Sequence, residues 1–260
     1  RNKTMNKEEK IQEFQKIIDQ AKHIVFFTGA GVSTLSGIPD FRSQDGLYNQ
    51  KYAYPPEEII SHHYFEENPE EFFRFYKDKM LHLDAKPNIV HTFIAECEKK
   101  GKSLGVVAKL EKKGKLKAVV TQNIDGLHQA AGSKRVYEIH GSVERNYCEK
   151  CHKFFDAEYI KDAEGVPYCD ACGGIVKPDV VLYEEGLSEA VLNGAIAAIQ
   201  SSDVLVVLGT SLVVYPAAGL LRYFGGKYLV LVNRDATPYD TAADLVINDT
   251  FENVFPKLHI

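Results

Sequence analysis

The sequence lacks the marks of three large classes of protein. It has no surplus of basic residues, because 31 lysines and arginines stand against 36 aspartates and glutamates, for a net charge of -5. Nucleic-acid-binding proteins neutralise phosphates with such a surplus, so we expect no direct contact with DNA or RNA. Long apolar runs are also missing, since Val204–Leu208 and Leu229–Val232 are far too short to span a bilayer, and we expect no membrane partner. The first ten residues are polar and contain no signal-peptide core, which favours a cytoplasmic protein.

Cysteine is scarce, with five residues, and four of them form two C-x-x-C pairs. Seventeen residues separate Cys148–Cys151 from Cys169–Cys172, which is the spacing of a zinc ribbon. Four thiolates close the shell of a tetrahedral ion, so we expect one structural zinc with ligands Cys148, Cys151, Cys169 and Cys172. A redox pair is the alternative, but redox chemistry would not need two copies around a short polar loop. Cys97 has no partner at ligand spacing, which indicates a buried or half-buried thiol.

Strands and helices alternate along the 260 residues, which suit one large domain with a smaller insertion or two modest domains. Apolar patterning predicts strands over these segments: His23–Phe27, Ala118–Thr121, Arg135–Ile139, Pro178–Tyr183, Val204–Leu208, Tyr228–Val232 and Leu245–Ile247. It predicts helices over these: Lys7–Gln20, Glu57–Phe65, Pro69–Leu81, Pro87–Ile94, Glu189–Gln200 and Pro216–Phe224. The repeated order of strand, polar turn and helix indicates an α/β fold with a doubly wound parallel sheet.

A short tandem repeat interrupts this order. Ala95–Val107 and Ala108–Val120 match at eight of 13 positions, and the unit is too short for a solenoid. We interpret it either as a local duplication that adds one helix–turn–strand piece or as a sequence artefact. Since only the second copy runs directly into Thr121, only that copy must form the strand that follows.

The first strand runs into a turn of small residues, Thr28–Ser33, with glycines at 29 and 31. Such glycines let a phosphate approach the backbone, which is half of a dinucleotide site. Position 34 is threonine where the usual G-x-G-x-x-G fingerprint has its third glycine, so a plain strand–turn–helix unit remains the alternative. A hydride-transferring dehydrogenase would need the full fingerprint and an acidic residue about twenty positions on, and the segment near 50 offers only Asp45 and Glu57.

Polar side chains gather where a later strand ends. Gln122, Asn123 and Asp125 follow Thr121, and ligands of open α/β sheets bind at this end of the strands. An Asx-type turn is the alternative interpretation of these three residues. Arg135–Ile139 points His140 toward the same edge of the sheet.

Six motifs then stand in the order found in the sirtuins. They are GAGVSTLSGIPDFRS from Gly29, TQNIDGLH from Thr121, His140-Gly141, the two cysteine pairs, GTSLVVYPAAGL from Gly209, and a strand that ends in Asn233. The sequence therefore resembles these NAD-dependent protein lysine deacylases from about Ile11 onward. The resemblance implies a Rossmann-like domain that binds NAD, over 7–43, 86–140 and 178–260. It also implies a small domain made of a helical module, 44–85, and a zinc ribbon, 141–177, with an acyl-lysine peptide in the cleft between the domains and a monomeric enzyme.

The resemblance also implies roles for single residues. The pyrophosphate, ribose and adenine sides of NAD would contact Gly29, Ala30, Ser33, Thr34, Phe41, Arg42, Gln122, Asn123, Ile124, Asp125, Gly209, Thr210, Ser211, Asn233, Arg234 and Asp249. Asn123 and Asp125 would hold the carboxamide and the nearby ribose hydroxyls, and Phe41 would shield the site from water. His140 would be the general base, since an imidazole titrates near neutrality. We expect His128 to be a packed residue, and His62, His63, His82 and His91 to lie on the surface or on a helix face.

The resemblance places Val180, Val181 and Val214 in the peptide groove. Family members commonly read V-x-F-G-E after the ribbon, whereas this chain reads Val181-Leu-Tyr-Glu-Glu185, so Leu182 and Glu184 change the groove wall. Members that prefer succinyl or malonyl groups carry a tyrosine and an arginine where this chain has Tyr76 and Lys79. Lysine cannot form the bidentate fork that arginine offers a carboxylate, so we expect acetyl-lysine as the main substrate. Acidic acyl groups, ADP-ribosyl transfer to protein and a silent NAD or peptide sensor stay as alternatives.

Overall fold

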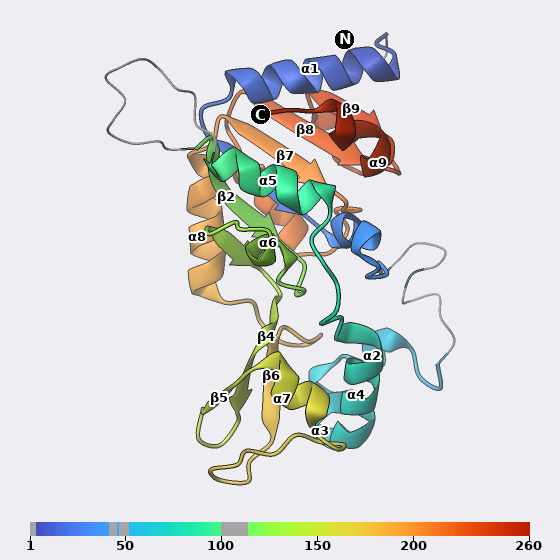
Figure 1. Cartoon of the computed structure of the whole chain (residues 1–260), viewed down its shortest axis with the longest axis vertical. Coiled ribbons are helices and arrows are strands. Elements are labelled where there is room, and N and C mark those ends of the chain that lie inside the picture. The colour runs from blue at the N-terminus through green and yellow to red at the C-terminus, as the bar shows by residue number, and fades with distance from the viewer. Residues whose placement is uncertain (1–3, 42–45, 47–51, 100–113) are drawn as a thin grey trace.

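The computed structural model describes residues 4–41, 46, 52–99 and 114–260, and it consists of two units, each built on its own sheet (Figure 1). The larger unit holds a six-stranded parallel sheet in the order β3-β2-β1-β7-β8-β9. Its strands are β1 Ile24–Thr28, β2 Leu116–Thr121, β3 Val136–Glu138, β7 Val204–Leu208, β8 Tyr228–Asn233 and β9 Leu245–Asn248. The expected α/β fold with a doubly wound parallel sheet is confirmed.

The central strands of this sheet are buried on both faces. Every residue of β1 and of β7 is buried, as continuous β-branched and aromatic runs allow when helices cover both faces. From β1 the chain adds β2 and β3 on one side, and from β7 it adds β8 and β9 on the other. The connections therefore diverge at the β1–β7 pair, which creates a crevice at the carboxyl ends of these two strands.

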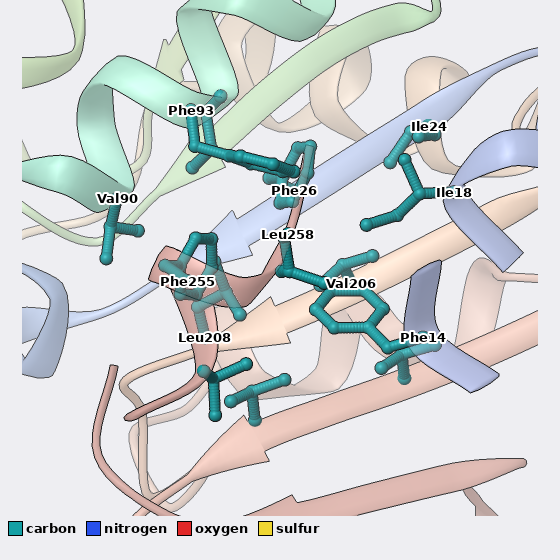
Figure 2. Close-up of a cluster of buried hydrophobic side chains, with 14 of the residues drawn as sticks. Phe14, Ile18, Ile24, Phe26, Val90, Phe93, Val206, Leu208, Phe255 and Leu258 are labelled. Carbon is teal, nitrogen blue, oxygen red and sulfur yellow. The ribbon is translucent and has the colours of Figure 1, made fainter. Parts of the chain in front are cut away.

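Successive residues of the strands serve opposite cores. Phe26, Val206 and Leu208 join the core under α1, α5 and α9, in which Phe93 and Phe255 also pack (Figure 2). The odd-numbered residues of the same strands face the second core, under α8 and a 3₁₀ segment. The helices and the segment are α1 Lys7–Gln20, α5 Ile89–Lys99, α6 Leu127–Ala130, α8 Glu189–Gln200, α9 Phe251–Val254 and the 3₁₀ segment Ala217–Tyr223. The two cores hold the sheet between two layers of helices, and they do not cover the edge formed by the carboxyl ends of its strands.

The smaller unit combines a three-stranded antiparallel sheet, β5-β4-β6, with short helices (Figure 1). Its elements are β4 Gly141–Cys148, β5 Phe154–Phe155, β6 Val176–Val180, α2 Pro56–Ile59, α3 His62–Glu67, α4 Pro69–Phe75, the π-helical turn Tyr76–Met80 and α7 Ala157–Asp162. Phenylalanines of α3 and α4 share one hydrophobic cluster with Cys148, Cys169 and Val176 of the ribbon. The helical module and the ribbon therefore form a single core.

Several elements differ from the prediction. The helix expected over Pro69–Leu81 ends at Phe75 and continues as the π-helical turn, and the helix expected over Pro87–Ile94 is α5 Ile89–Lys99. Three further differences show the cause. The helix expected over Glu57–Phe65 is two helices, because Ser61 caps α3 through Tyr64 N–H and pairs as a bridge with Tyr183. The strand expected over Pro178–Tyr183 is β6 Val176–Val180, which ends where β4 ceases to pair with it. The segment expected as a helix over Pro216–Phe224 is 3₁₀. Tertiary contacts, not local propensity, set these three boundaries.

Some predictions fall partly outside the described residues. Arg42 and most of the 95–107/108–120 repeat lie there, although the first copy begins in α5 and the second ends in β2. Cys97 is fully buried in α5, which confirms the interpretation as a packed thiol. Within the described ranges, no helix combines the length and apolarity that a membrane span requires.

Candidate active site

Two cavities meet at the carboxyl edge of the parallel sheet. The sheet-edge cavity, about 800 Å³, is lined by residues of 30–41, 122–140 and 209–252. The inter-unit cavity, about 450 Å³, is lined by both units, including Lys79 and Val143 of the smaller one. The residues that line both cavities are Ala30, Ile38, Pro39, Phe41, Gln122, Asn123, His140 and Val214. Two ligands that occupy these cavities would therefore meet beside His140 and Phe41.

Two glycine turns pack backbone against backbone on the floor of the sheet-edge cavity. Gly31 N–H donates to the Gly209 carbonyl at 2.8 Å, and Gly209 has a φ of 63°. A Cβ on Gly31 would lie 2.8 Å from Gly209 Cα, so neither turn tolerates a side chain there. Gly29 does not line either cavity, since a Cβ on it would meet Thr210 Cβ at 2.6 Å. Its role is the close approach of the turns, not contact with a ligand.

Polar side chains from three strand ends join across the same floor. Thr210 Oγ1 donates to Gln122 Oε1 at 3.0 Å, and Thr210 N–H donates to Asn233 Oδ1 at 2.8 Å. Gln122 Nε2 and Asn233 Nδ2 are buried without a partner among the described residues. These two amide groups are hydrogen-bond donors beside the cavity, which suits a ligand rich in oxygen. Thr34, Ser211, Arg234 and Asp249 line this cavity as well.

A buried network supports the polar end of the inter-unit cavity. Ser33 Oγ donates to Asp125 Oδ2 at 2.6 Å, and Asn123 Nδ2 donates to the Gly29 carbonyl at 2.9 Å. Asp125 Oδ1 also accepts from Leu127 N–H at 2.9 Å. The result is one carboxylate and one amide held rigidly at the end of β2, and Ser33, Asn123, Ile124 and Asp125 all line this cavity.

His91 lies behind this network. It was expected on the surface or on a helix face; it does lie on helix α5, but it is not exposed. It is fully buried, with Nδ1 accepting from Asn88 N–H at 3.1 Å and Nε2 lying 3.4 Å from Ser33 Oγ. Burial lowers its pKa to about 4. Sequence periodicity missed it because a histidine inside a helix carries no pattern that separates a core position from a surface one.

His140 lies between the two cavities. Its Nδ1 is 3.0 Å from the Gln122 carbonyl, so this nitrogen carries the proton and Nε2 keeps its lone pair. Burial lowers its pKa, against the opposing effect of the hydrogen bond to Gln122. His128 is packed, as expected: it is buried, and its Nε2 lies 2.8 Å from Thr28 Oγ1. His140 is thus the histidine with a free acceptor nitrogen beside both cavities.

The peptide-side residues do not all reach the inter-unit cavity. Val180, Val181, Val214 and Lys79 line it. Tyr76 does not: its side chain is fully buried among the phenylalanines of α4, and burial raises the pKa of its hydroxyl. The prediction that Tyr76 contacts the substrate beside Lys79 is corrected, because this turn is π-helical and the Tyr76 side chain packs in the aromatic cluster.

Further lining residues escaped the sequence reasoning. Those in the sheet-edge cavity are Leu35, Ile38, Pro39, Asp40, Asp235, Ala236, Phe251 and Glu252, and those in the inter-unit cavity include Met80, His82, Tyr183 and Tyr215. Ile38, Pro39 and Asp40 stood inside a motif already singled out, so position within that motif was the available signal. Leu35 and Tyr215 also stood inside quoted motifs, whereas Phe251 and Glu252 of α9 and Met80 of the π-helical turn reach the cavities through tertiary packing.

The four cysteines of the ribbon converge on one point. Their sulfur atoms all lie within 4.8 Å of one another, with Cys148 Sγ 3.4 Å from Cys172 Sγ and Cys151 Sγ 3.6 Å from Cys169 Sγ. Zinc–sulfur bonds of about 2.3 Å in a tetrahedron place sulfurs roughly 3.8 Å apart. Backbone N–H groups of Lys150 and Ala171 donate to two of these sulfurs. The cluster therefore fits a tetrahedral metal ion with four thiolate ligands.

These features define an α/β protein with a dinucleotide-type crevice and a four-cysteine metal module. The chain belongs to the Sir2 family, whose model matches residues 29–216. It is 56% identical over 249 residues, 95% of this chain and 96% of the relative, to a protein of Clostridium acetobutylicum named NAD-dependent protein deacetylase. A relative of the same name from Staphylococcus aureus is 45% identical over 250 residues, 95% of this chain and 97% of the relative.

Solved structures agree with this membership. A structure of Sir2 with a p53 peptide and NAD+ is 40% identical, covers 95% of this chain and 96% of its own, and superposes with a TM-score of 0.80. A Sir2 structure bound to a propionylated peptide is 38% identical, with the same coverage and TM-score. The similarity covers both units, so it includes every element that lines the two cavities.

Proposed function

We propose that the chain is an NAD-dependent protein lysine deacetylase, which yields nicotinamide, an O-acyl-ADP-ribose and free lysine. The observation that carries the proposal is the meeting of two cavities at His140, one suited to a dinucleotide and the other open to a side chain from between the units. Relatives named NAD-dependent protein deacetylases support the same activity.

The sheet-edge cavity suits NAD. The paired turns at Gly31 and Gly209 bring bare backbone to its floor, and the unpartnered Gln122 and Asn233 amides offer donors to hydroxyls or phosphate oxygens. We assign NAD to Ala30, Ser33, Thr34, Phe41, Arg42, Gln122, Asn123, Ile124, Asp125, Gly209, Thr210, Ser211, Asn233, Arg234 and Asp249. Ser33, Ile124 and Asp125 line the polar end of the inter-unit cavity, into which the nicotinamide end of NAD would extend. When bound, NAD supplies an electrophilic ribose carbon from which nicotinamide can leave.

Asn123 and Asp125 orient the carboxamide and the nearby ribose. Their own hydrogen bonds to Gly29, Ser33 and Leu127 fix both side chains before a ligand arrives, so no reorganisation is needed when charge develops. Phe41 lines both cavities and would exclude water from the reacting carbon. Exclusion is needed because an amide oxygen is a weak nucleophile that competes with water.

His140 acts as the general base. Its Nδ1–H is held by the Gln122 carbonyl, so Nε2 is the atom that accepts a proton from a ribose hydroxyl. The lowered pKa keeps this nitrogen unprotonated at neutral pH. Removal of this proton makes the ribose hydroxyl a nucleophile, to which the acyl group is transferred from the lysine.

The inter-unit cavity suits an acyl-lysine side chain. Val180, Val181 and Val214 give it an apolar wall for the aliphatic stem and a short acyl group. Lys79 also lines this cavity, which is the one feature that favours acidic acyl groups. With Tyr76 in the core, the tyrosine–cation pair expected for succinyl or malonyl recognition is incomplete, so we favour acetyl-lysine.

The remaining assignments concern architecture. We propose that the Rossmann-like domain comprises 7–43, 86–140 and 178–260, and that 44–85 and 141–177 form the small domain. The separate cores support this division except at 178–182, because β6 and Leu182 pack with the smaller unit. We propose zinc as the metal of the cysteine cluster, since four thiolates favour it. We also propose a monomeric, cytoplasmic enzyme, and four cysteines gathered at a metal site with a fifth buried as a thiol fit a reducing compartment.

An acetyl-lysine peptide incubated with NAD tests the function. We expect release of nicotinamide together with deacetylated peptide and O-acetyl-ADP-ribose, measured by mass spectrometry, and loss of all three in a His140→Ala variant. Nicotinamide release that does not depend on the acetyl group, with label transferred from NAD to protein, would identify ADP-ribosyl transfer instead. Binding of NAD and peptide without turnover would identify a silent sensor.

The same peptide with acetyl, succinyl and malonyl groups tests the acyl preference. We expect the highest kcat/KM with acetyl-lysine, because Lys79 is a single cation that also contacts Asp78 at 3.5 Å. Faster turnover of succinyl-lysine would contradict this preference while leaving the deacylase function intact.

A further inference from the structure

One wall of the inter-unit cavity is held by helix α3. The wall segment, residues 181–187, lines the cavity over its whole length. Backbone bonds tie it to the start of α3: His62 N–H donates to the Tyr183 carbonyl at 3.0 Å, and Tyr183 N–H donates to the Ile60 carbonyl at 3.1 Å. The position of this wall therefore depends on the helical module.

A tight turn shapes the wall segment. Glu185 N–H donates to the Leu182 carbonyl at 3.1 Å, and Leu182 N–H donates back to Glu185 Oε1 at 2.8 Å. Glu184 occupies the third position of the turn with a φ of 78°, a left-handed conformation that favours glycine. A glutamate is strained here, so the contacts of its side chain must compensate for that strain.

Both glutamates of the turn pair with a histidine of α3. His63 Nδ1 lies 2.8 Å from Glu184 Oε1, and His63 N–H donates to the same oxygen at 3.1 Å. His62 Nδ1 lies 2.8 Å from Glu185 Oε2. Lys177 of β6 contacts Glu185 Oε1 at 3.3 Å. Two side-chain pairs thus reinforce the backbone contact between the helix and the wall.

The surroundings of both histidines are mainly acidic. His62 faces Glu185 from the wall and Glu66 from its own helix, with Lys177 on the far side of Glu185. The hydrogen bond that His62 donates to the Glu185 carboxylate raises the pKa of His62. His63 faces Glu184, with Glu67 of α3 and Glu58 of α2 nearby, and the hydrogen bond that His63 donates to Glu184 raises the pKa of His63. Each histidine therefore stays charged to a higher pH than a free histidine, and its pair weakens above that pH.

We propose that His62 and His63 are positioning residues that hold the wall segment through Glu185 and Glu184 and thereby strengthen binding of the acyl-peptide substrate. Neither histidine belongs to the described residues that line the cavity, so they act through the glutamates. The inference rests on the proposed deacetylation, in which the inter-unit cavity receives acyl-lysine. It concerns KM for the peptide and leaves the chemistry beside His140 unchanged.

A double-mutant cycle tests the His63–Glu184 pair. We expect His63→Gln and Glu184→Gly each to raise KM for an acetyl-lysine peptide about two- to fivefold, the range of an exposed ion pair, with kcat within about twofold of the native value. The double variant should match the single variants, because both remove one interaction. Glu184→Gly also relieves the strained backbone, so a role in folding alone predicts an unchanged or lower KM. Exposed His259→Gln serves as the matched control and should leave KM unchanged.

The pH dependence of KM supplies the second readout. In the native protein, KM for the peptide should rise above about pH 6.5, as the raised pKa values of His62 and His63 are passed. This rise should disappear in the His62→Gln/His63→Gln variant. The inference would be overturned if KM stayed at the native value in all variants, or if the effects of the two single variants on KM added up in the double variant. Turnover by these variants would show that the proposed function still holds. Absence of turnover in the native protein would instead overturn the proposed function.

Discussion

At the scale of single residues, the hydrogen bonds of His140 determine which of its nitrogens is available. Nδ1 lies 3.0 Å from the Gln122 carbonyl and must donate, which leaves Nε2 as an acceptor at the junction of the two cavities. Burial lowers the pKa of the imidazole, because charge is disfavoured away from water. The neutral form therefore persists below the pH at which a free histidine is half protonated.

This argument predicts the acidic limb of the pH–rate profile. A base must be unprotonated, so kcat should hold from pH 8 to below about 6.5 and fall only when the lowered pKa of His140 is reached. His140→Ala should lower kcat by about 10²- to 10⁴-fold and remove this limb. Nicotinamide release measured from pH 5 to 8 checks both statements. A limb centred above pH 7 would contradict them.

Much of the candidate site could be predicted residue by residue. Asn123, Asp125 and His140 follow strands whose carboxyl ends must share one edge, so chain order alone brings them together. Tyr76 and His91 could not be placed in this way. Their burial depends on which helix face meets the aromatic cluster of α4 or the network at Ser33, and a local pattern does not encode that choice.

At the scale of elements, the turns after β1 and β7 work as one unit. Gly31→Ala places a Cβ 2.8 Å from Gly209 Cα, and its nearest neighbours are all backbone atoms of Gly209, with no flexible side chain that could move away. We expect a loss of about 1 to 3 kcal/mol in unfolding free energy, as overpacking gives, together with a raised KM for NAD. Urea unfolding and steady-state kinetics measure the two effects. Gly225→Ala is the control, because a Cβ there meets no atom within 4 Å, and equal losses in both variants would refute the explanation.

The cysteine cluster allows a second prediction at this scale. Cys148 and Cys169 belong to the same hydrophobic cluster as the phenylalanines of α4, so loss of the metal should loosen the helical module as well as the ribbon. Cys172→Ser should abolish bound zinc in elemental analysis and lower the melting temperature and the activity together. Cys97→Ala should retain the metal, since Cys97 lies buried in the larger unit. Full zinc content in Cys172→Ser would show that the four thiolates are not the ligands.

The order and type of most elements could also be predicted, because the strands are buried on both faces and read as continuous apolar runs. Lys7–Gln20, Glu189–Gln200 and Val204–Leu208 have the expected bounds. The break between α2 and α3 could not be foreseen, since Ser61 is both a helix cap and the partner of Tyr183, more than a hundred residues away. Such a boundary reflects a long-range contact.

At the scale of the whole molecule, the described chain folds around three hydrophobic cores, two against the parallel sheet and one in the smaller unit. The candidate site lies between the larger and the smaller unit. One of its walls is the carboxyl edge of the parallel sheet, and another is the wall segment, which is bonded to the start of α3. The residues proposed for catalysis follow strands of the parallel sheet, whereas Lys79 and the partners of the wall segment belong to the smaller unit. Changes in the smaller unit should therefore alter substrate binding more than chemistry.

Two buried histidines make the stability of the whole fold depend on pH. Burial lowers the pKa of His91 to about 4 and that of His128 to about 3, and their rings lie 4.9 Å apart. The unfolded chain binds protons near pH 6.5 while the native chain does not, so stability is fully present above that pH and is lost as pH falls toward the two native values. We expect each histidine to remove about 2 kcal/mol of unfolding free energy between pH 8 and 5. Urea unfolding at pH 5, 6, 7 and 8 measures this slope, which should become shallower in His128→Gln and stay unchanged in exposed His259→Gln. An equal slope in His128→Gln would mean that its protonation is not linked to folding.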